Sequence, residues 1–373
     1  MSNPYDPQTP ARPQYFGGRE PVLNVVRERV ESAITHKKSG GILIYGHRGV
    51  GKTSLLKKII DEAKGSEEFP SNALTFYRRF ARTTNDQELY ATLNEELVAQ
   101  IDNRKNLIET LKALGKKIEG INLYGVEFNT ANHTEKSSYQ IWKSNLSGLK
   151  NVDYVLIALD DADFLSIEAI GELKSIVEDT NSVPVLLVIS GGILFEAKLV
   201  DDYSPVARIF SGASFNIGTL DLKETKEVLE KPLLHESTKW QPEAIKKLHE
   251  LTAGYPYLIQ CLAKASYTEN TTITIGDVKN HIKDAISIGK SWLDHEIPTA
   301  SDQDVLSFVK IIKLEKNIIQ NVEMGNLGVP PVYIGRLVKL GVLKKISRGR
   351  YQLLKSPIIA TFEELKRALP QNK

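Results

Sequence analysis

One short stretch of the sequence combines the residue types that bind a phosphate chain. It follows an apolar run at residues 42–45 and leads into a helical pattern at residues 55–60. Its nine residues are Gly46, His47, Arg48, Gly49, Val50, Gly51, Lys52, Thr53 and Ser54. Glycines let backbone N–H groups turn toward an anion, the lysine can reach terminal phosphates, and the threonine hydroxyl can ligate Mg²⁺. The pattern G-x-x-x-x-G-K-[ST] between a strand and a helix therefore predicts a phosphate-binding P-loop.

A second chemical feature is the acid pair Asp160 and Asp161, which follows an apolar run at residues 154–159. Six consecutive apolar residues are typical of a strand buried on both faces, and open α/β sheets bind ligands at the carboxyl ends of such strands. We expect Asp160 to hold Mg²⁺ opposite Thr53, and Asp161 to orient an attacking water. Asp163 is interpreted as an acid at the N-terminus of a helix.

Two polar residues farther along each have two interpretations. Ser190 follows an apolar run at residues 183–189. Its hydroxyl either bonds the γ-phosphate or the attacking water, or it satisfies a turn. Arg208 precedes an expected strand at residues 214–220. It is either a surface residue or an arginine finger that offsets transition-state charge in a neighbouring subunit's nucleotide site.

A parallel sheet is needed to bring these residues together. The apolar runs predict its strands, and residues 86–101 repeat leucine and isoleucine at helical spacing. Strands are expected at residues 42–45, 73–80, 154–159, 183–189 and 214–220, helices at 23–34, 86–101 and 138–149, and a small hairpin at 118–128. The fold class expected from this alternation is α/β.

The predicted domains are a proline-rich tail at residues 1–14, a P-loop core at 15–221, a helical lid at 222–298 and a winged helix at 299–373. The tail should be extended or disordered unless it docks on something. Helices are expected in the lid at 223–234, 241–251, 257–267 and 275–288. The last domain should hold helices at 302–314, 318–324 and 331–340, and strands at 342–346 and 351–354.

Positive charge is concentrated at the C-terminus. Residues 331–373 contain ten lysines and arginines against two acids, although the whole chain has a net charge of only +2. Lys344, Lys345, Arg348 and Arg350 lie on or beside the expected hairpin turn. This pattern predicts contact with a nucleic acid backbone, yet solvated lysines or a protein-docking module would give the same pattern.

Composition limits the class of protein. A hydrophobic fraction of 41% and a charged fraction of 25% are typical of soluble globular proteins. The sequence has no apolar run long enough to span a membrane and no signal peptide, so we expect a cytoplasmic protein without a membrane partner. Cys261 is the only cysteine, which excludes an intrachain disulfide and a cysteine-built zinc site. On an apolar helix face it is expected to be a core residue.

In order along the chain, the run at residues 16–20, the P-loop, the acid pair, Ser190, Arg208 and the run at residues 254–256 resemble the STAND-class ATPases. More narrowly, the chain resembles archaeal-type ATPases related to AAA+ origin-recognition proteins. The resemblance implies that Phe16 and Arg19 lie near the adenine. It also implies that Ser190 is a sensor 1 residue and Arg208 a finger-like arginine, and that Pro256 packs on the nucleotide. The sequence departs from the AAA+ pattern at two places. Asp161 replaces the usual glutamate, which favours the STAND side and is compatible with slow turnover, and residues 254–256 contain no sensor 2 arginine.

Two hypotheses from different classes follow. The first is an ATPase switch that uses ATP/ADP and Mg²⁺, forms nucleotide-dependent homo-oligomers and engages DNA through the winged helix. The second is a regulatory STAND module that docks a protein partner, hydrolyses ATP slowly and does not bind DNA. A small-molecule kinase is disfavoured because the sequence has no recognisable acceptor-site motif. Pro256 also has a structural interpretation, as the first residue of a helix.

Overall fold

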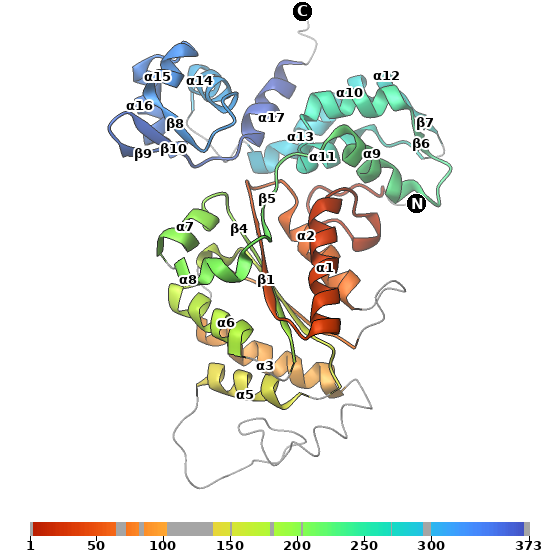
Figure 1. Ribbon diagram of the computed structural model, residues 1–373. Helices are drawn as coiled ribbons and strands as arrows, with labels where there is room; N and C mark the ends of the chain where they lie inside the picture. The colour runs from red at the N-terminus through yellow and green to blue at the C-terminus, as the bar shows by residue number, and fades with distance from the viewer. Residues whose placement is uncertain are drawn as a thin grey trace, which may run out of the picture. The chain divides into compact units, whose positions relative to one another are not determined.

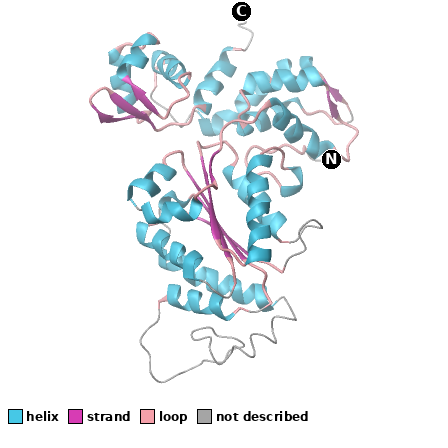
Figure 2. Cartoon of the chain, in the orientation of Figure 1, coloured by secondary structure: helices cyan, strands magenta, loops and turns pink. Residues whose placement is uncertain are grey.

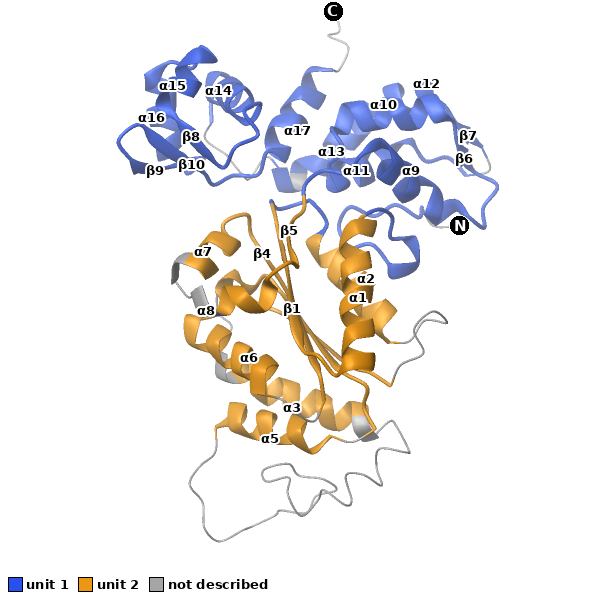
Figure 3. Cartoon of the chain, viewed as in Figure 1, with its two compact units in different colours: residues 1–18, 47–51, 218–373 blue, residues 19–46, 52–217 orange. Residues whose placement is uncertain are grey.

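The computed structural model describes residues 3–64, 72–81, 86–102, 137–149, 151–179, 183–202, 204–269, 271–293 and 300–368. The chain divides into two compact units (Figure 3). Unit 1 contains residues 1–18, 47–51 and 218–373, and unit 2 contains residues 19–46 and 52–217. The P-loop segment 47–51 therefore groups with the C-terminal part of the chain, whereas the strand and helix on either side of it belong to unit 2.

Unit 2 is built on a parallel sheet of five strands (Figure 1). The strand order is β2-β3-β4-β1-β5, and every pair of neighbours runs parallel. The bounds are β1 Gly40–Tyr45, β2 Leu74–Arg79, β3 Val155–Asp160, β4 Val185–Gly191 and β5 Ser214–Asn216. This sheet confirms the predicted α/β core. β5 ends four residues before the expected end, because the chain passes into unit 1 from Gly218.

Helices cover both faces of this sheet. On one face lie α1 (Glu20–His36) and α2 (Lys52–Ala63), and on the other lie α3 (Asp86–Asp102), α5 (Ser138–Gly148) and α6 (Ile167–Asp179). Shorter elements follow as η2 (Ala162–Phe164), α7 (Phe195–Asp202), α8 (Ser204–Ala207) and η3 (Arg208–Phe210). The predicted hairpin at 118–128 lies outside the described residues.

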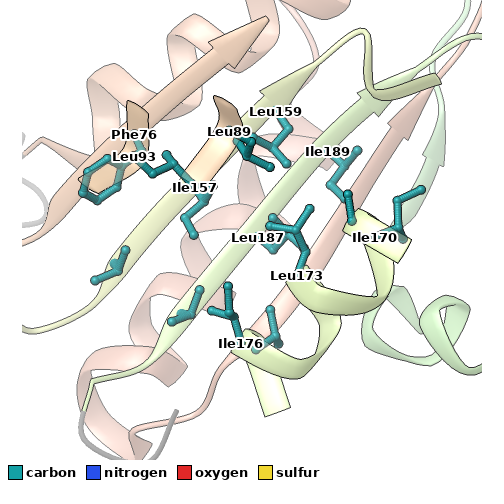
Figure 4. Close-up of a cluster of buried hydrophobic side chains, with 14 of the residues drawn as sticks. Phe76, Leu89, Leu93, Ile157, Leu159, Ile170, Leu173, Ile176, Leu187 and Ile189 are labelled. Atoms are coloured by element: carbon teal, nitrogen blue, oxygen red, sulfur yellow. The ribbon is translucent and has the colours of Figure 1, made fainter. Parts of the chain in front are cut away.

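The core between the sheet and the second group of helices explains why β3 is so apolar. Every residue of β3 is buried. In Figure 4, Ile157 and Leu159 of β3 lie toward Leu89 and Leu93 of α3, and Leu173 of α6 lies toward β4. Each such side chain contributes roughly 1.5–3 kcal/mol by leaving water. The helical spacing of the leucines in α3 thus reflects the face that meets the sheet.

Unit 1 is mainly helical, as the cyan ribbons of Figure 2 show. Its first elements are η1 (Pro13–Tyr15), α9 (Leu222–Glu230), η4 (Lys231–Leu233), α10 (Pro242–Thr252), α11 (Pro256–Ser266), α12 (Ile275–Asn280) and α13 (Ile282–Leu293). Two short strands, β6 (Lys239–Trp240) and β7 (Thr272–Ile273), pair in parallel. The single helix expected at 275–288 is wrong, because α12 ends before His281 and α13 begins after it.

The C-terminal elements are α14 (Asp302–Ile312), β8 (Ile318–Gln320), α15 (Asn321–Asn326), α16 (Pro331–Lys339), β9 (Leu343–Ser347), β10 (Arg350–Leu353) and α17 (Ile358–Arg367). The three strands form an antiparallel sheet in the order β8-β10-β9. The helix expected at 318–324 is therefore wrong at its start, because Ile318–Gln320 pair with β10. Helix α17 packs against α10, α13 and α14, which joins these elements to the rest of unit 1.

The N-terminal tail packs on the other elements of unit 1 through Tyr5. This side chain is fully buried, and its ring contacts Trp240 and Tyr267 edge to face. Its hydroxyl donates to the carbonyl of Leu229 at 2.6 Å and accepts from the Trp240 indole N–H at 2.8 Å. Asn3 adds a bond to the Lys264 carbonyl. Tyr5 and Asn3 thus hold the tail in place.

Among the described residues, no helix is both long and apolar enough to cross a membrane.

Candidate functional site

The P-loop connects the end of β1 to the start of α2. Gly49 and Gly51 have φ angles of 87° and 94°, a region in which residues with a side chain are strained. Lys52 folds back, and its ammonium donates to the carbonyl of Gly46 at 3.0 Å. A lysine held on a loop carbonyl can exchange that acceptor for a phosphate oxygen without moving far. The glycines and the lysine thus fit a phosphate ligand.

Asp160, at the end of β3, is the centre of a buried polar cluster. Its side chain is fully inaccessible to solvent. One carboxylate oxygen accepts from the Thr53 hydroxyl at 2.7 Å and from the Tyr77 hydroxyl at 3.1 Å, and the other accepts from the Ser190 hydroxyl. A buried carboxylate is tolerated only when hydrogen bonds replace its water. The structure brings together Thr53 and Asp160, whose side-chain oxygens are suitable ligands for Mg²⁺.

Sheet order explains the position of Ser190. β4 lies between β1 and β3, and Ser190 is in register with Ile44 near the end of β1. The serine hydroxyl therefore stands beside Asp160, and it also accepts from the Asp161 backbone N–H at 3.4 Å. Ser190 is the penultimate residue of β4 and does not form part of a turn.

Asp161 leaves the strand with a φ of 55° and points its carboxylate at Arg79. The Arg79 Nε donates to it at 2.8 Å, although 60% of the Arg79 side chain is exposed. Asp163 lies in η2, where its carboxylate accepts from the Gly192 N–H at 2.7 Å. Burial raises the pKa of Asp163. The acid pair thus separates into a buried Asp160 and a more accessible Asp161.

Tyr77 and Arg79 were missed by the sequence reasoning. Both lie on β2, where Arg79 is in register with Asp160 of β3. Burial, together with the negative charge of Asp160, raises the pKa of Tyr77, so its hydroxyl stays a hydrogen-bond donor. Pairing of β2 with β3 could have pointed to these two residues. Polar residues at the carboxyl ends of neighbouring parallel strands lie close together.

The tip of the P-loop contacts the C-terminal part of unit 1. The Arg48 guanidinium lies 5.2 Å from the centre of the Trp292 ring, and the Arg48 carbonyl accepts from the Ser356 hydroxyl at 3.0 Å. A Cβ atom at Gly49 would come within 3.1 Å of both Trp292 and Ile358. Residues of α13 and of the start of α17 therefore hold the loop tip closely.

The residues implied by the family resemblance divide between the units. In unit 1, the carbonyl of Phe16 accepts from Lys231 at 3.0 Å, and Pro256 is the first residue of α11 with its ring near Gly51. In unit 2, Arg19 precedes α1 with a φ of 67°, and Arg208 is exposed at the start of η3. Their predicted nucleotide roles stay predictions.

The basic hairpin, defined as Lys344, Lys345, Arg348 and Arg350, lies on β9, β10 and their turn. All four residues are exposed. Gly349 has a φ of 72°, which a tight turn between two strands requires. Arg336, in contrast, donates two 2.7 Å hydrogen bonds to the carboxylate of buried Asp304. Those bonds hold the pKa of Asp304 well below its usual range.

Comparison with known proteins gives a family match over part of the chain. Residues 35–195 match a family described as an AAA domain. No curated protein has a matching sequence. Among solved structures, the ADPNP–ADP complexes of the ORC2 protein of Aeropyrum pernix align with 94% of this chain and 94% of theirs, with a TM-score of 0.56 and 14% identity. A Walker-type ATPase of Pyrococcus abyssi aligns over 94% and 96%, with a TM-score of 0.50 and 17% identity.

The chain has the fold of an AAA-type P-loop ATPase. The family match includes the P-loop, Asp160 and Ser190, so it covers the same residues that form the polar cluster. The structural matches extend over both units and share the fold at low sequence identity. Together they support the AAA+ class inferred from the motifs, whereas the STAND branch and the winged helix stay predictions.

Proposed function

We propose that this protein is a Mg²⁺-dependent ATPase switch whose nucleotide state controls self-association and engagement of DNA. The observation that carries the ATPase assignment is the 2.7 Å contact between the Thr53 hydroxyl and the Asp160 carboxylate. These oxygens come from the helix after the P-loop and from the end of β3. Such a pair matches the protein ligands of Mg²⁺ in P-loop ATPases. The ORC2 protein of Aeropyrum pernix has been solved with ADP and ADPNP, which favours adenine nucleotides here as well.

Each residue of the site then has a defined task. Mg²⁺, when bound, neutralises phosphate charge. Lys52 would leave the Gly46 carbonyl for a phosphate oxygen, and Thr53 and Asp160 would hold the ion. Asp161, the more accessible acid, would orient the attacking water once Arg79 releases it. Ser190 would keep Asp160 in place through its hydrogen bond.

The contacts of the P-loop tip support a switch. Trp292 and Ser356 hold Arg48, and Gly49 packs against Trp292 and Ile358. A phosphate chain needs the N–H groups of this same loop. Nucleotide binding should therefore rearrange the contacts to α13 and α17 and pass its signal to the C-terminal elements.

Engagement of DNA is proposed for the C-terminal elements, interpreted as a winged helix. The basic hairpin carries four exposed cations, and within the described part of the chain none of them forms a bidentate ion pair like that of Arg336. Cations on a protruding hairpin can contact phosphates or enter a minor groove. Arg208, exposed on unit 2, is proposed as the residue that reaches a neighbouring subunit's nucleotide.

A second candidate function is docking of a protein partner. Val322 and Val332 are 70% and 64% exposed, and Ile346 is 48% exposed. All three lie in the C-terminal elements, where apolar exposure favours a protein surface.

Electrophoretic binding to duplex DNA, measured across salt concentrations with and without Mg·ATP, separates the two candidates. The switch proposal predicts nucleotide-dependent binding that weakens steeply with salt. Absence of binding in every condition would reject the DNA role and leave the docking function.

A further inference from the structure

A cavity of about 430 Å³ lies at the edge of β2. It is lined in part by Tyr77, whose hydroxyl donates to Asp160 of the proposed Mg²⁺ site. Among the strands that the structure describes, β2 is the terminal one of its sheet. The polar residues of the cavity come from β2, α3 and the residue after α2, and they are Lys64, Thr75, Tyr77, Arg78, Glu96 and Gln100. Its size falls within the range of small-molecule sites.

The charges of the lining favour an anion. Arg78 donates to Glu96 through one terminal nitrogen at 2.9 Å, while its Nε is buried and has no hydrogen-bond partner in the described structure. Burial raises the pKa of Glu96, and the charge of Arg78 opposes that rise. Lys64 adds a second cation at the cavity wall. The lining thus carries two cationic side chains, Arg78 and Lys64, against one acid, Glu96, and this charge balance favours an anionic ligand.

An added peptide strand is the main competing occupant of a sheet edge. Here the Gln100 side chain already forms hydrogen bonds with the backbone of Thr75 at this edge. Its amide oxygen accepts from the Thr75 N–H at 3.2 Å, and its amide nitrogen donates to the Thr75 carbonyl at 2.8 Å. A peptide would have to displace both bonds, so the geometry favours a small ligand.

We propose that this cavity binds a small organic anion. Arg78 and Lys64 would hold its carboxylate or phosphate group, and its carbon skeleton would lie against Ile60 and the Tyr77 ring. The Tyr77 hydroxyl also donates to Asp160, so occupancy should change the proposed Mg²⁺ site and the rate of ATP hydrolysis. This coupling rests on the proposed ATPase function, whereas anion binding does not.

Calorimetry on the full chain tests the site. The chain carries Lys52→Ala to suppress phosphate binding at the P-loop, and the probes are citrate in one arm and glycerol 3-phosphate in the other. At least one probe should bind with a stoichiometry of one, and the tighter probe identifies the anion class. Arg78→Gln should weaken binding at least tenfold, because it removes the guanidinium. Lys58→Gln, a matched loss of charge on α2 outside the cavity, should change it less than twofold.

A cavity-filling variant keeps the proposal testable if Arg78→Gln does not fold. Ala99 lines the cavity from α3, and Ala99→Trp should abolish binding while it leaves every charge in place. Failure of both probes to bind, or binding unchanged in both Arg78→Gln and Ala99→Trp, would overturn the proposal.

The coupling has its own measurement. With Lys52 intact, the bound probe should change ATP turnover at least twofold, and Arg78→Gln should remove that effect. If the chain hydrolyses no ATP, the proposed function fails while anion binding is still measured. If turnover occurs but does not respond to a bound probe, the coupling is rejected.

Discussion

Polar residues in the Asp160 cluster and in the basic hairpin differ in where their partners lie. Around Asp160, hydroxyls of Thr53, Tyr77 and Ser190 come from three different elements and converge on one buried carboxylate. In the hairpin, four cations lie exposed on two strands and a turn. The Asp160 carboxylate has its hydrogen-bond partners within the chain, whereas the four cations of the hairpin face solvent.

The surroundings of a polar side chain determine how closely its function can be inferred from geometry. A buried carboxylate held by three hydroxyls is costly to build, so its chemistry is strongly constrained by its surroundings. Exposed lysines and arginines make few contacts that constrain their function, and the same arrangement of cations suits several kinds of partner. Substitutions at the site around Asp160 should therefore have specific effects, whereas those in the basic hairpin should act through charge.

Asp161→Asn should have the largest effect. The amide keeps the size of the side chain but removes the base, so ATP hydrolysis should fall by roughly 10³-fold while ATP affinity changes less than threefold. A phosphate-release assay together with calorimetry measures both quantities. Asp179→Asn makes the same change on the exposed face of α6 and should be neutral. Turnover that survives Asp161→Asn would place the base elsewhere.

Arg336→Ala should destabilise the C-terminal elements, because it leaves the Asp304 carboxylate without its bidentate partner. The pKa of Asp304 is lowered in the folded protein, so the ion pair stabilises fully above the ordinary aspartate pKa near 4. That contribution is lost as the pH falls toward the lowered value.

Denaturant unfolding should therefore show a constant difference between wild type and Arg336→Ala above about pH 5, and a smaller one below about pH 4. Lys339→Ala, an exposed neighbour on α16, should change stability by less than about 0.5 kcal/mol. A difference that grows on acidification would contradict the assigned ion pair.

Charge reversal of the whole basic hairpin to glutamate should weaken duplex binding roughly 30-fold near physiological salt and flatten its salt dependence. Folding should be unaffected, since these side chains are exposed. The matched control reverses four exposed lysines on other helices of unit 1, namely Lys223, Lys246, Lys279 and Lys283. Equal losses in both variants would show that only total charge matters.

Tyr5→Phe should have the smallest effect, a loss of about 1 kcal/mol in the stability of unit 1. The ring and its contacts remain, while the Leu229 carbonyl and the Trp240 indole lose a partner. Thermal unfolding monitored by tryptophan fluorescence reports the change, and Tyr15→Phe, at the end of η1, serves as the control. A neutral Tyr5→Phe would show that ring packing alone docks the tail.

The sequence predicted the features that depend on neighbouring residues. The P-loop needs its glycines, lysine and threonine within nine positions, and a fully buried strand needs an unbroken apolar run such as the one before Asp160. Both signals are local, so the sheet strands and the meeting of Thr53 with Asp160 could be inferred before the structure was known.

Features that depend on pairing across the chain were missed. Tyr77 and Arg79 reach the acid pair only because β2 pairs with β3 in one register. Ile318–Gln320 form a strand because β10 lies beside them, although their apolar residues suit a helix equally well. The contact of Arg48 with Trp292 joins segments more than 200 residues apart, and no local pattern marks it.

The proposed function requires that the P-loop and the Asp160 cluster together bind Mg·ATP. Isothermal calorimetry with Mg·ATP on wild type and on Lys52→Ala tests it most directly, with EDTA added in a second titration. One ATP per chain should bind to wild type, at least 100-fold more weakly to Lys52→Ala, and more weakly to wild type without Mg²⁺. The absence of heat with wild type, or equal affinity in the two proteins, would contradict it.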